Sequence, residues 1–449
     1  MEYAATSSMG AGRTRCSRRT PGFVPVLGFL ALTGLLAWHN LTHVPRVTVP
    51  EPRMPVPNAF DTLVLAGKRV QEHREINNLY HLLQKRALTG VPQDRDTNNL
   101  RASLVAKNAA ALELMRQSFG KEYLHPPVRS WDTMFPYLVS FRDLAQLCVL
   151  EAQEYAARGA WARSLDSCLD AVELGATIPR GGVLITHLVG ISCESLGRAA
   201  AWQAVDHLSA EEARRAVARL ERVLARTVPI ADTLQEEKWA GQAGMAHFFQ
   251  DPFWRLKQNP LSQWTYPGDE ASRLELDSIV TCLRLHFYSN ERLMRRYTEF
   301  MDACIATARK PYIAQGAFPA IPQEPLVSAL VPAPASVQFQ FLNNQAQNTL
   351  LLTALALRAF KQERGAYPRE LQELVPGYLS QVPADPFGAG SLVYRRVGES
   401  YRLYSIGPDR QDDGGRPMDK GNQTGSHPRY RYQVELNGKG DIVQGINTL

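Results

Sequence analysis

The chain has 449 residues, of which 45% are hydrophobic and 21% are charged, and its formal net charge is +6 at pH 7. These values indicate a folded protein with room for two or three domains, and they exclude an intrinsically disordered chain. Four arginines of the basic excess lie in residues 13–19, directly before an apolar run. Membrane topology explains such a flank better than nucleic-acid binding does, so we expect no nucleic-acid partner.

The apolar run, residues 22–38, reads GFVPVLGFLALTGLLAW and carries no charge. Its length is about the minimum needed to cross a hydrocarbon layer of ~30 Å. Because the basic residues 1–21 should stay in the cytoplasm, we predict an uncleaved signal anchor that contacts membrane lipid, with the bulk of the chain periplasmic or on the cell surface. A cleaved signal peptide, a twin-arginine signal and a buried core helix are the alternatives, and each explains the pattern less well.

Residues 39–57 are predicted to form a stalk. Five prolines occur between positions 44 and 57, a density that forbids a helix and favours an extended spacer. We therefore expect this segment to hold the folded part of the chain off the bilayer.

Residues 58–310 carry the periodicity of a helical domain. Asn58 is a predicted cap for a helix that runs to about Val70, and a second helix is predicted from about Asn99 to Phe119. The strongest segment is 209–226, where Ser209 and Glu212 form a capping box ahead of a stripe of alanine, valine and leucine. A further helix is predicted from Leu184 to Leu208.

Two helices are predicted to meet at Gly159 within residues 141–175, because glycine commonly ends a helix. This hairpin resembles a single tetratricopeptide unit. The small-residue, glycine and aromatic pattern of that family falls on Ala152, Ala156, Gly159, Trp161, Ser164 and Ala171. A solenoid needs about three repeats, so we interpret the hairpin as part of an irregular bundle.

The six cysteines fit neither a zinc pattern nor a disulfide framework, and we expect most of them to be buried on helices. A bridge between Cys148 and Cys168 is the alternative that the hairpin leaves open.

An exported hydrolase or carbohydrate-active enzyme is the alternative function. It would use Glu236 and Glu237 with the aromatic residues between Trp239 and Trp264. Adjacent helical residues point about 100° apart, so the two carboxylates should not face one substrate. Ser195 and its neighbours at 192–194 are predicted to be core residues, and the chain contains no GxSxG, HExxH or P-loop motif. We therefore identify no catalytic residue and no small-molecule substrate.

Residues 311–336 contain six prolines between positions 311 and 334 and are predicted to be a linker. A long helix should follow from Val337 to Arg364. After it come Tyr367-Pro368, a short helix at 371–379, a turn at 383–388, two strands near 391–396 and 401–405, and the sequence LYSIGPD at 403–409.

In this order the motifs resemble the soluble domain of the major pseudopilin of type II secretion systems, pseudopilin G. The resemblance covers residues 337–449 and implies a small α+β module with a short antiparallel sheet. In a pseudopilin the transmembrane helix directly precedes this module, whereas here about 300 residues separate the two, and Gly22 to Val26 lack the glutamate of a prepilin. We therefore interpret the module as one reused on a different protein, with a pseudopilus subunit as the alternative.

The resemblance also implies a calcium site in the acidic, glycine-rich loop that ends the block. Asp409, Asp412, Asp413 and Asp419 offer the hard oxygen ligands that calcium requires. A solvated turn is the alternative.

The sequence thus predicts a mainly α protein: a transmembrane helix, a helical bundle with a tetratricopeptide-like hairpin, and a pseudopilin-like α+β module. The chain as a whole resembles a bacterial membrane-anchored protein. The function that we expect is a non-enzymatic extracytoplasmic scaffold or interaction protein with protein partners in the cell envelope, related by its C-terminal module to secretion or pilus systems.

Overall fold

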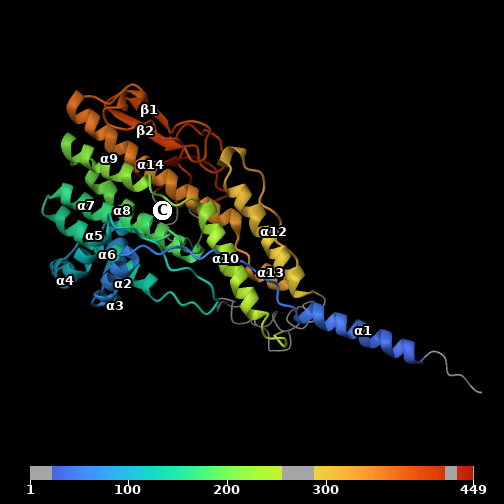
Figure 1. The fold of residues 1–449 in the computed structure, drawn as a ribbon. Helices are drawn as coiled ribbons and strands as arrows, with labels where there is room; N and C mark the ends of the chain where they lie inside the picture. The colour runs from blue at the N-terminus through green and yellow to red at the C-terminus, as the bar shows by residue number, and fades with distance from the viewer. Residues whose placement is uncertain (1–22, 255–287, 420–431, 448–449) are drawn as a thin grey trace, which may run out of the picture.

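The computed structural model describes residues 23–254, 288–419 and 432–447. The fold is mainly helical, with a small antiparallel sheet near the C-terminus, as the sequence predicts (Figure 1). Cys16, Cys282 and Trp264 lie outside the described residues, as do the four arginines of the N-terminal flank.

The first half of the chain forms α1 (Phe23–Thr42), α2 (Ala59–Lys68), α3 (His73–Thr89), α4 (Arg95–Lys107), α5 (Ala109–Ser118), α6 (Tyr137–Ala157), α7 (Trp161–Thr177), α8 (Leu184–Val205), α9 (Ala210–Leu224) and α10 (Ile230–Phe248). The second half forms α12 (Asn290–Ala308), η2 (Tyr312–Ala314), α13 (Pro325–Leu330), α14 (Pro334–Arg364), η3 (Leu371–Leu374), β1 (Val393–Val397), β2 (Ser400–Ser405) and β3 (Ile442–Val443).

Most helix boundaries follow the local signals. Asn58 accepts a hydrogen bond from the Phe60 amide at 3.0 Å and begins α2, although α2 ends at Lys68 rather than near Val70. The capping box of Ser209 and Glu212 begins α9, as predicted. Gly159 has a φ of 70° and separates α6 from α7, which confirms the predicted hairpin.

The single helix predicted from Asn99 to Phe119 is wrong, because the chain breaks at Asn108 into α4 and α5. The Asn108 side chain is 1% exposed and accepts a hydrogen bond from the Gln71 amide at 2.7 Å. It also donates to the Leu104 carbonyl at 2.9 Å. The bond to Gln71, 37 residues away, and the bond to the end of α4 replace the continuing helix.

Residues 43–57 contain no regular secondary structure, as their prolines predict. They are tied to the folded body, however, and do not form a free spacer. The side-chain amide of Asn290 donates to the His43 carbonyl at 3.0 Å. The Arg129 guanidinium donates to the Pro50 carbonyl at 2.9 Å. The body is therefore held close to the end of α1.

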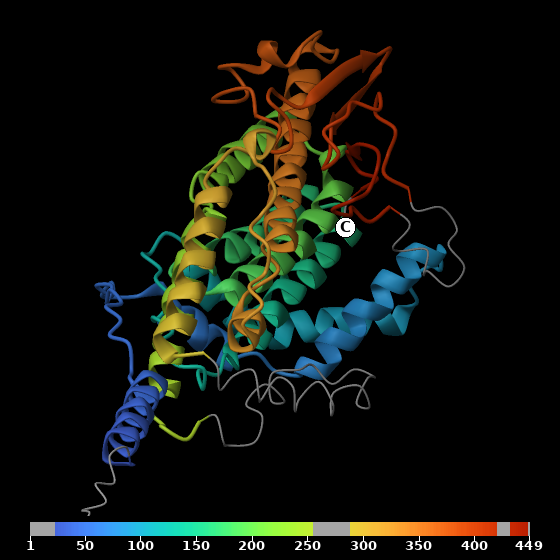
Figure 2. The same cartoon turned by 90° about the vertical axis from the view of Figure 1, so that its right-hand side faces the viewer.

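The helical body and the C-terminal segment share a hydrophobic core, which includes Leu169 on α7, Leu350 on α14 and Leu403 on β2. Helix α14 runs the length of the body, with α8 and α9 beside it and the sheet over its C-terminal half (Figures 1 and 2). The strand order is β1-β2-β3, with all neighbours antiparallel. The sequence missed β3 because it is a two-residue strand.

Helices α7 and α8 approach each other closely through glycines. A Cβ atom added to Gly175 would lie 2.4 Å from the Gly190 carbonyl oxygen, and one added to Gly197 would lie 2.3 Å from the Cys168 carbonyl oxygen. Cys148, Cys168, Cys193 and Cys304 are buried free thiols, so the alternative bridge between Cys148 and Cys168 is not formed.

Among the described residues, the helical stretch Pro325–Arg364 is the one long and apolar enough, by length and composition, to cross a membrane. Its apolar side chains are packed inside the protein: Leu350, Leu351 and Leu355 are 0% exposed. This stretch is therefore a core helix in the fold. At the other end of the chain, α1 projects from the body (Figure 1).

Candidate functional site

A buried polar network joins α8 to the N-terminal half of α14. The Arg198 guanidinium donates to the side-chain oxygens of Asn344 at 2.7 Å and Asn348 at 2.8 Å. The side-chain amide of Asn348 donates in turn to the Glu194 carboxylate at 2.5 Å. All four side chains are less than 5% exposed. An ion-carrying network this deep must satisfy its own polar groups.

Burial dominates the electrostatics of this network. It raises the pKa of Glu194 above its usual range, and hydrogen bonds from Asn344 and Asn348 and the charge of Arg198 oppose that rise. Burial likewise lowers the pKa of Arg198 to about 10, against the opposing effect of Glu194. Each charge therefore depends on the other, because a lone charge in this position has no water to solvate it.

A cavity of about 670 Å³ lies beside the network, between α8, α14 and residues 433–437. Arg198, Ser195 and Asn343 line it. Two polar atoms of this lining are buried without a hydrogen-bond partner, Nε of Arg198 and Oδ1 of Asn343. Sequence reasoning placed Ser195 and its neighbours in the core. Cys193 and Glu194 are buried there, but the intermediate exposure of Ser195 puts it on the cavity wall.

A nucleophilic arrangement is not assembled at Ser195. His187 is the nearby histidine in the sequence, and its Nδ1 lies 2.7 Å from the Thr233 hydroxyl. Burial lowers the pKa of His187 to about 4, so the imidazole is neutral and held by the threonine. This histidine is part of the packing between α8 and α10.

The predicted acidic loop follows β2. Asp412 accepts hydrogen bonds from the Tyr404 hydroxyl and the Gly414 amide, both at 2.8 Å, and these bonds lower its pKa. Asp413 pairs with Arg416 at 3.1 Å. Asp409 accepts from the Gln411 amide at 3.2 Å, and Asp419 is exposed at the end of the described range 288–419.

Asp441 also belongs to this loop, and sequence reasoning missed it. Its carboxylate accepts from the Gly415 amide at 2.7 Å and from the Asp413 amide at 3.4 Å. The residue is 0% exposed, and burial raises its pKa to about 6, with smaller contributions from Asp412 and Asp413. The signal was absent because Asp441 lies 22 residues beyond Asp419 and is brought back by β3.

The fit of this loop to calcium rests on Asp441. A buried carboxylate next to two others is an environment that a cation would stabilise. However, Asp413 is paired with Arg416, and Arg395 lies 3.6 Å from Asp412. In residues 23–254, 288–419 and 432–447, no three histidine, cysteine, aspartate or glutamate side chains are grouped closely enough to hold a metal ion. Calcium binding therefore stays a prediction.

Glu236 and Glu237 point to different partners. The Glu237 carboxylate accepts a hydrogen bond from the Leu184 amide at 2.9 Å and thus caps the N-terminus of α8 from a distant helix. Glu236 lies 3.5 Å from Arg129. Glu236 and Trp239 line a cavity of about 200 Å³ that Glu237 does not reach. The carboxylates of Glu236 and Glu237 therefore do not face a common site.

The aromatic residues at and beyond the C-terminal end of α10 pack against one another and against Trp131. The ring of Phe248 lies 5.4 Å from that of Trp131 and 4.9 Å from that of Trp254. Phe249 lies 5.5 Å from Trp254, and both are nearly fully buried. These spacings are those of core packing rather than of a ligand platform.

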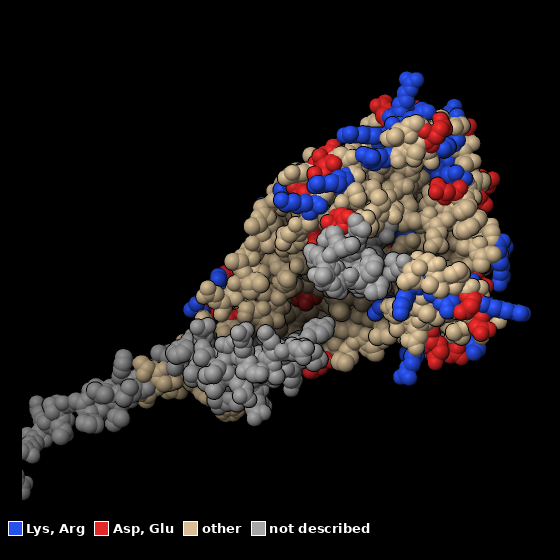
Figure 3. All heavy atoms as spheres, turned by 180° about the vertical axis from the view of Figure 1, so that it is seen from behind, with Lys and Arg blue, Asp and Glu red and all other residues tan. Residues whose placement is uncertain are grey.

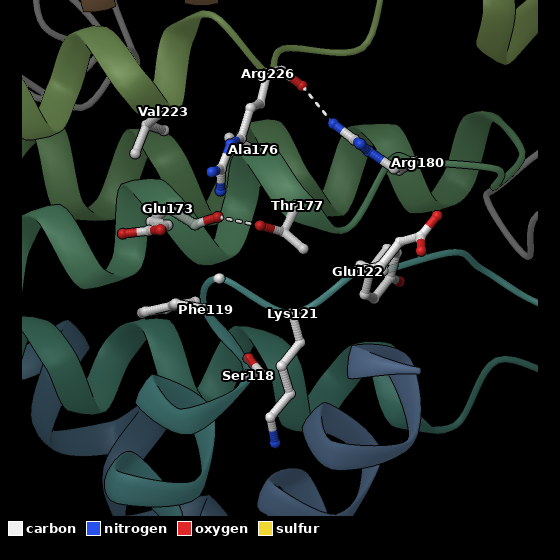
Figure 4. Close-up of a pocket in the computed structure, with 12 residues that line it drawn as sticks. Ser118, Phe119, Lys121, Glu122, Glu173, Ala176, Thr177, Arg180, Val223 and Arg226 are labelled. Atoms are coloured by element: carbon white, nitrogen blue, oxygen red, sulfur yellow. Dashed lines mark hydrogen bonds between the residues drawn. The ribbon is translucent and has the colours of Figure 1, made fainter. Parts of the chain in front are cut away.

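A further cavity of about 330 Å³ lies between the α5–α6 loop, α7 and α9 (Figure 4). Its polar groups are used by the fold. The Thr177 hydroxyl donates to the Glu173 carbonyl at 2.7 Å, and Arg180 donates to the Arg226 carbonyl at 3.1 Å. The Glu173 carboxylate accepts from Arg219 at 2.9 Å. Lys121 points away from Glu173 and Thr177 (Figure 4).

Comparison of the chain with protein-family models, curated proteins and solved structures finds no match in any of the three. The function is therefore inferred from the sites above and from the surfaces that the fold exposes.

Proposed function

We propose that the chain is a membrane-anchored extracytoplasmic interaction protein whose anchor is α1. One observation carries the proposal: large apolar side chains in the described part of α1 face solvent. Leu32 is 57% exposed, Leu35 is 66% exposed and Trp38 is 51% exposed. A row of large apolar side chains without protein cover calls for another apolar medium, and a lipid bilayer supplies it.

The surroundings of α1 support this assignment. Four arginines in residues 13–19 precede the helix, as expected for a cytoplasmic flank. At the opposite end, Trp38 lies at the position of an interfacial aromatic, 6.1 Å from the ring of Phe253. On the face drawn in Figure 3, charged side chains gather mainly over the end of the body far from α1.

The proposed link to secretion or pilus systems rests on the C-terminal segment. A long helix, α14, is followed by η3 and by the antiparallel pair β1 and β2, which is the order that the pseudopilin resemblance implies, and β3 adds a third strand. Several contacts also bind this segment to α9. Arg214 pairs with Glu363 at 2.7 Å and lies 4.1 Å from the ring centre of Tyr378. A segment locked in this way would act together with the helical body rather than as a filament subunit.

The anchor is tested by deleting residues 1–42. We expect the full chain to stay with the membrane pellet after alkaline extraction and the shortened chain to be soluble, with an unchanged circular dichroism spectrum. Helix α1 projects from the body, so we expect the body to fold without it, and solubility without unfolding is the specific result. Extraction of the full chain by alkali, or membrane retention of the shortened chain, would refute the anchor.

We also propose that calcium binds the acidic loop, as the pseudopilin resemblance implies, with the buried Asp441 as one ligand and with Asp412 and Asp413 turned from their arginine partners toward the ion. The supporting observation is the buried carboxylate of Asp441 with two acidic neighbours. Calcium should raise the melting temperature of the full chain in detergent. The increase should disappear in Asp441→Asn and persist in Glu211→Gln, which changes an exposed residue on α9. Equal melting temperatures with calcium and with chelator would reject this site.

A further inference from the structure

The N-terminal half of α14 is unusually rich in amide side chains. Seven of the eleven residues from 338 to 348 are asparagine or glutamine: Gln338, Gln340, Asn343, Asn344, Gln345, Gln347 and Asn348. The fold uses three of them: Asn344 and Asn348 accept hydrogen bonds from Arg198, Asn348 also donates to Glu194, and the Gln347 side-chain amide donates to the Asn447 backbone carbonyl. Gln338, Gln340 and Asn343 line cavities instead.

Two cavities adjoin this part of α14. The first, of about 670 Å³, is the one beside Arg198, with Gln340 and Asn343 in its wall. The second, of about 490 Å³, is bounded by residues 315–321 and the start of α14. Leu436 lines both cavities, so they lie side by side along the helix. Together they form what we name the amide groove.

The amide groove contains buried polar atoms that nothing in the described fold satisfies. Gln338 is 4% exposed and its Oε1 has no hydrogen-bond partner. Oδ1 of Asn343 and Nε of Arg198 are also unpartnered. Native proteins rarely leave buried polar atoms in this state, so each of these atoms calls for a partner from outside the described fold. These atoms include both acceptors and a donor.

We propose that the amide groove binds an extended peptide segment of a protein partner. A side-chain amide offers a donor and an acceptor in one plane, as a peptide unit does, so asparagine and glutamine complement a peptide backbone. In the second cavity, Phe318, Ile321 and Leu436 provide an apolar wall for one side chain of the peptide. Amides for the backbone beside an apolar pocket are the requirements of extended-peptide recognition.

The charges favour an uncharged backbone over an ionic ligand. Arg198 is balanced by Glu194 within the network, and the exposed Glu435 in the wall of the first cavity disfavours an anion. The Arg410 guanidinium lies 4.4 Å from the ring centre of Tyr312, at the edge of the second cavity. That stacking also occupies an aromatic face of the groove, and Phe339 is only 8% exposed. A glycan, which needs an open aromatic face, is therefore the poorer fit.

This inference deepens the proposed interaction role and rests on it. The groove and the anchor are separate parts of the molecule, so loss of peptide binding would leave the membrane retention of the chain intact. The two proposals can fail independently.

The test uses the full-length chain, immobilised in detergent, and a phage-displayed library of random heptapeptides. Selected peptides are synthesised, and their affinity is measured for the wild type and for three variants. Gln338→Leu and Asn343→Leu remove groove amides, whereas Gln345→Leu is a matched control on the same helix that lines neither cavity. We expect at least tenfold weaker binding to the first two and unchanged binding to the control.

A fourth variant keeps the test decisive if a helix variant fails to fold. Ile321 is 52% exposed, so Ile321→Ser should fold normally. Wild-type protein should bind the selected peptides more tightly when an apolar residue, rather than serine, enters this pocket. We expect Ile321→Ser to abolish that difference in affinity. The proposal is overturned if no peptide is enriched, if the groove variants bind as tightly as the wild type, or if maltoheptaose displaces the peptides.

Discussion

Helices α1 and α14 are both long and apolar, yet the fold treats them in opposite ways. On α14, Leu350, Leu351 and Leu355 are 0% exposed, because α8, α9 and the sheet surround the helix. On α1, Leu32 and Leu35 are more than half exposed. The two helices lie at different places in one molecule: α14 in its core and α1 projecting from it (Figure 2).

The difference teaches that composition alone does not distinguish a core helix from an anchor. Helix α14 carries amide side chains that bind the buried charged groups of Arg198 and Glu194, which are contacts that a bilayer does not offer. Residues 22–38 carry no charge and have a basic flank on one side. A core helix is marked by polar side chains with partners, and an anchor by their absence.

The largest expected effect comes from placing a charge on each helix. Leu351→Asp buries an unpaired carboxylate in the core and should lower the free energy of unfolding by at least about 4 kcal/mol. Leu35→Asp changes an exposed side chain of α1 and should leave that free energy unchanged. Urea denaturation of both variants, followed by near-UV circular dichroism, measures the contrast.

The matched readout for Leu35→Asp is membrane retention. An aspartate inside a membrane span is unfavourable, by up to about 2.5–3.5 kcal/mol at the centre and by less near the interface, so a larger fraction of this variant should be released by alkali. If Leu35→Asp instead unfolds the body while Leu351→Asp is tolerated, the roles of the two helices are reversed.

The second-largest expected effect concerns the hydrogen bonds between α14 and Arg198, which distinguish α14 from a membrane helix. Arg198→Met leaves Glu194 buried without its positive partner and should destabilise the chain by about 3–5 kcal/mol. Arg222→Met, on the exposed side of α9, should change stability by less than about 0.5 kcal/mol. An Arg198→Met variant as stable as the wild type would mean that the network does not hold α14 in the core.

The acidic loop lies beside the sheet that covers α14. Its buried carboxylate predicts that the stability of the protein depends on pH. The folded pKa of Asp441 is raised from 3.8 to about 6, so the folded state holds a proton that the unfolded state releases. This contribution to stability is complete below pH 3.8 and is lost as the pH rises through about 6. Calcium stabilisation should therefore be weak at pH 5 and strong at pH 7.5.

Thermal melts at both pH values, with calcium or chelator, check this sign. Asp441→Asn should flatten the pH dependence of the melting temperature between pH 4 and 7. An unchanged slope in this variant would show that another group titrates there.

The smallest expected effect is at the cap of α9, a helix that covers α14. Ser209→Ala removes the side-chain acceptor for the Glu212 amide and should cost about 1 kcal/mol. Urea denaturation detects a change of this size. Ser328→Ala is a suitable control, because that hydroxyl donates only to a carbonyl of its own short helix. An equal loss of stability in both variants would mean that the capping box contributes no stability of its own.

The sequence predicted the features that depend on local chemistry. The capping box at Ser209, the glycine that ends α6 and the apolar stripe of α14 each act within a few residues. The paired strands β1 and β2 were also predicted, because they are joined by a short turn.

The features that were missed depend on contacts distant in sequence. Asn108 breaks a helix through bonds to Gln71, and Arg198 meets Asn344 from 146 residues away. Asp441 joins the acidic loop only because β3 pairs with β2. For the candidate sites, sequence therefore supplied part of the acidic loop but neither its buried member nor the amide groove.

The central claim is that α1 remains on the mature protein as its anchor. Intact mass spectrometry of the protein purified from membranes tests this claim most directly. We predict an intact mass that includes residues 23–42. Digestion of the same sample should yield N-terminal peptides from the basic flank. A mature chain that begins after residue 38, or one processed at Gly22, would contradict the account, because α1 would then be a removed signal or a prepilin helix.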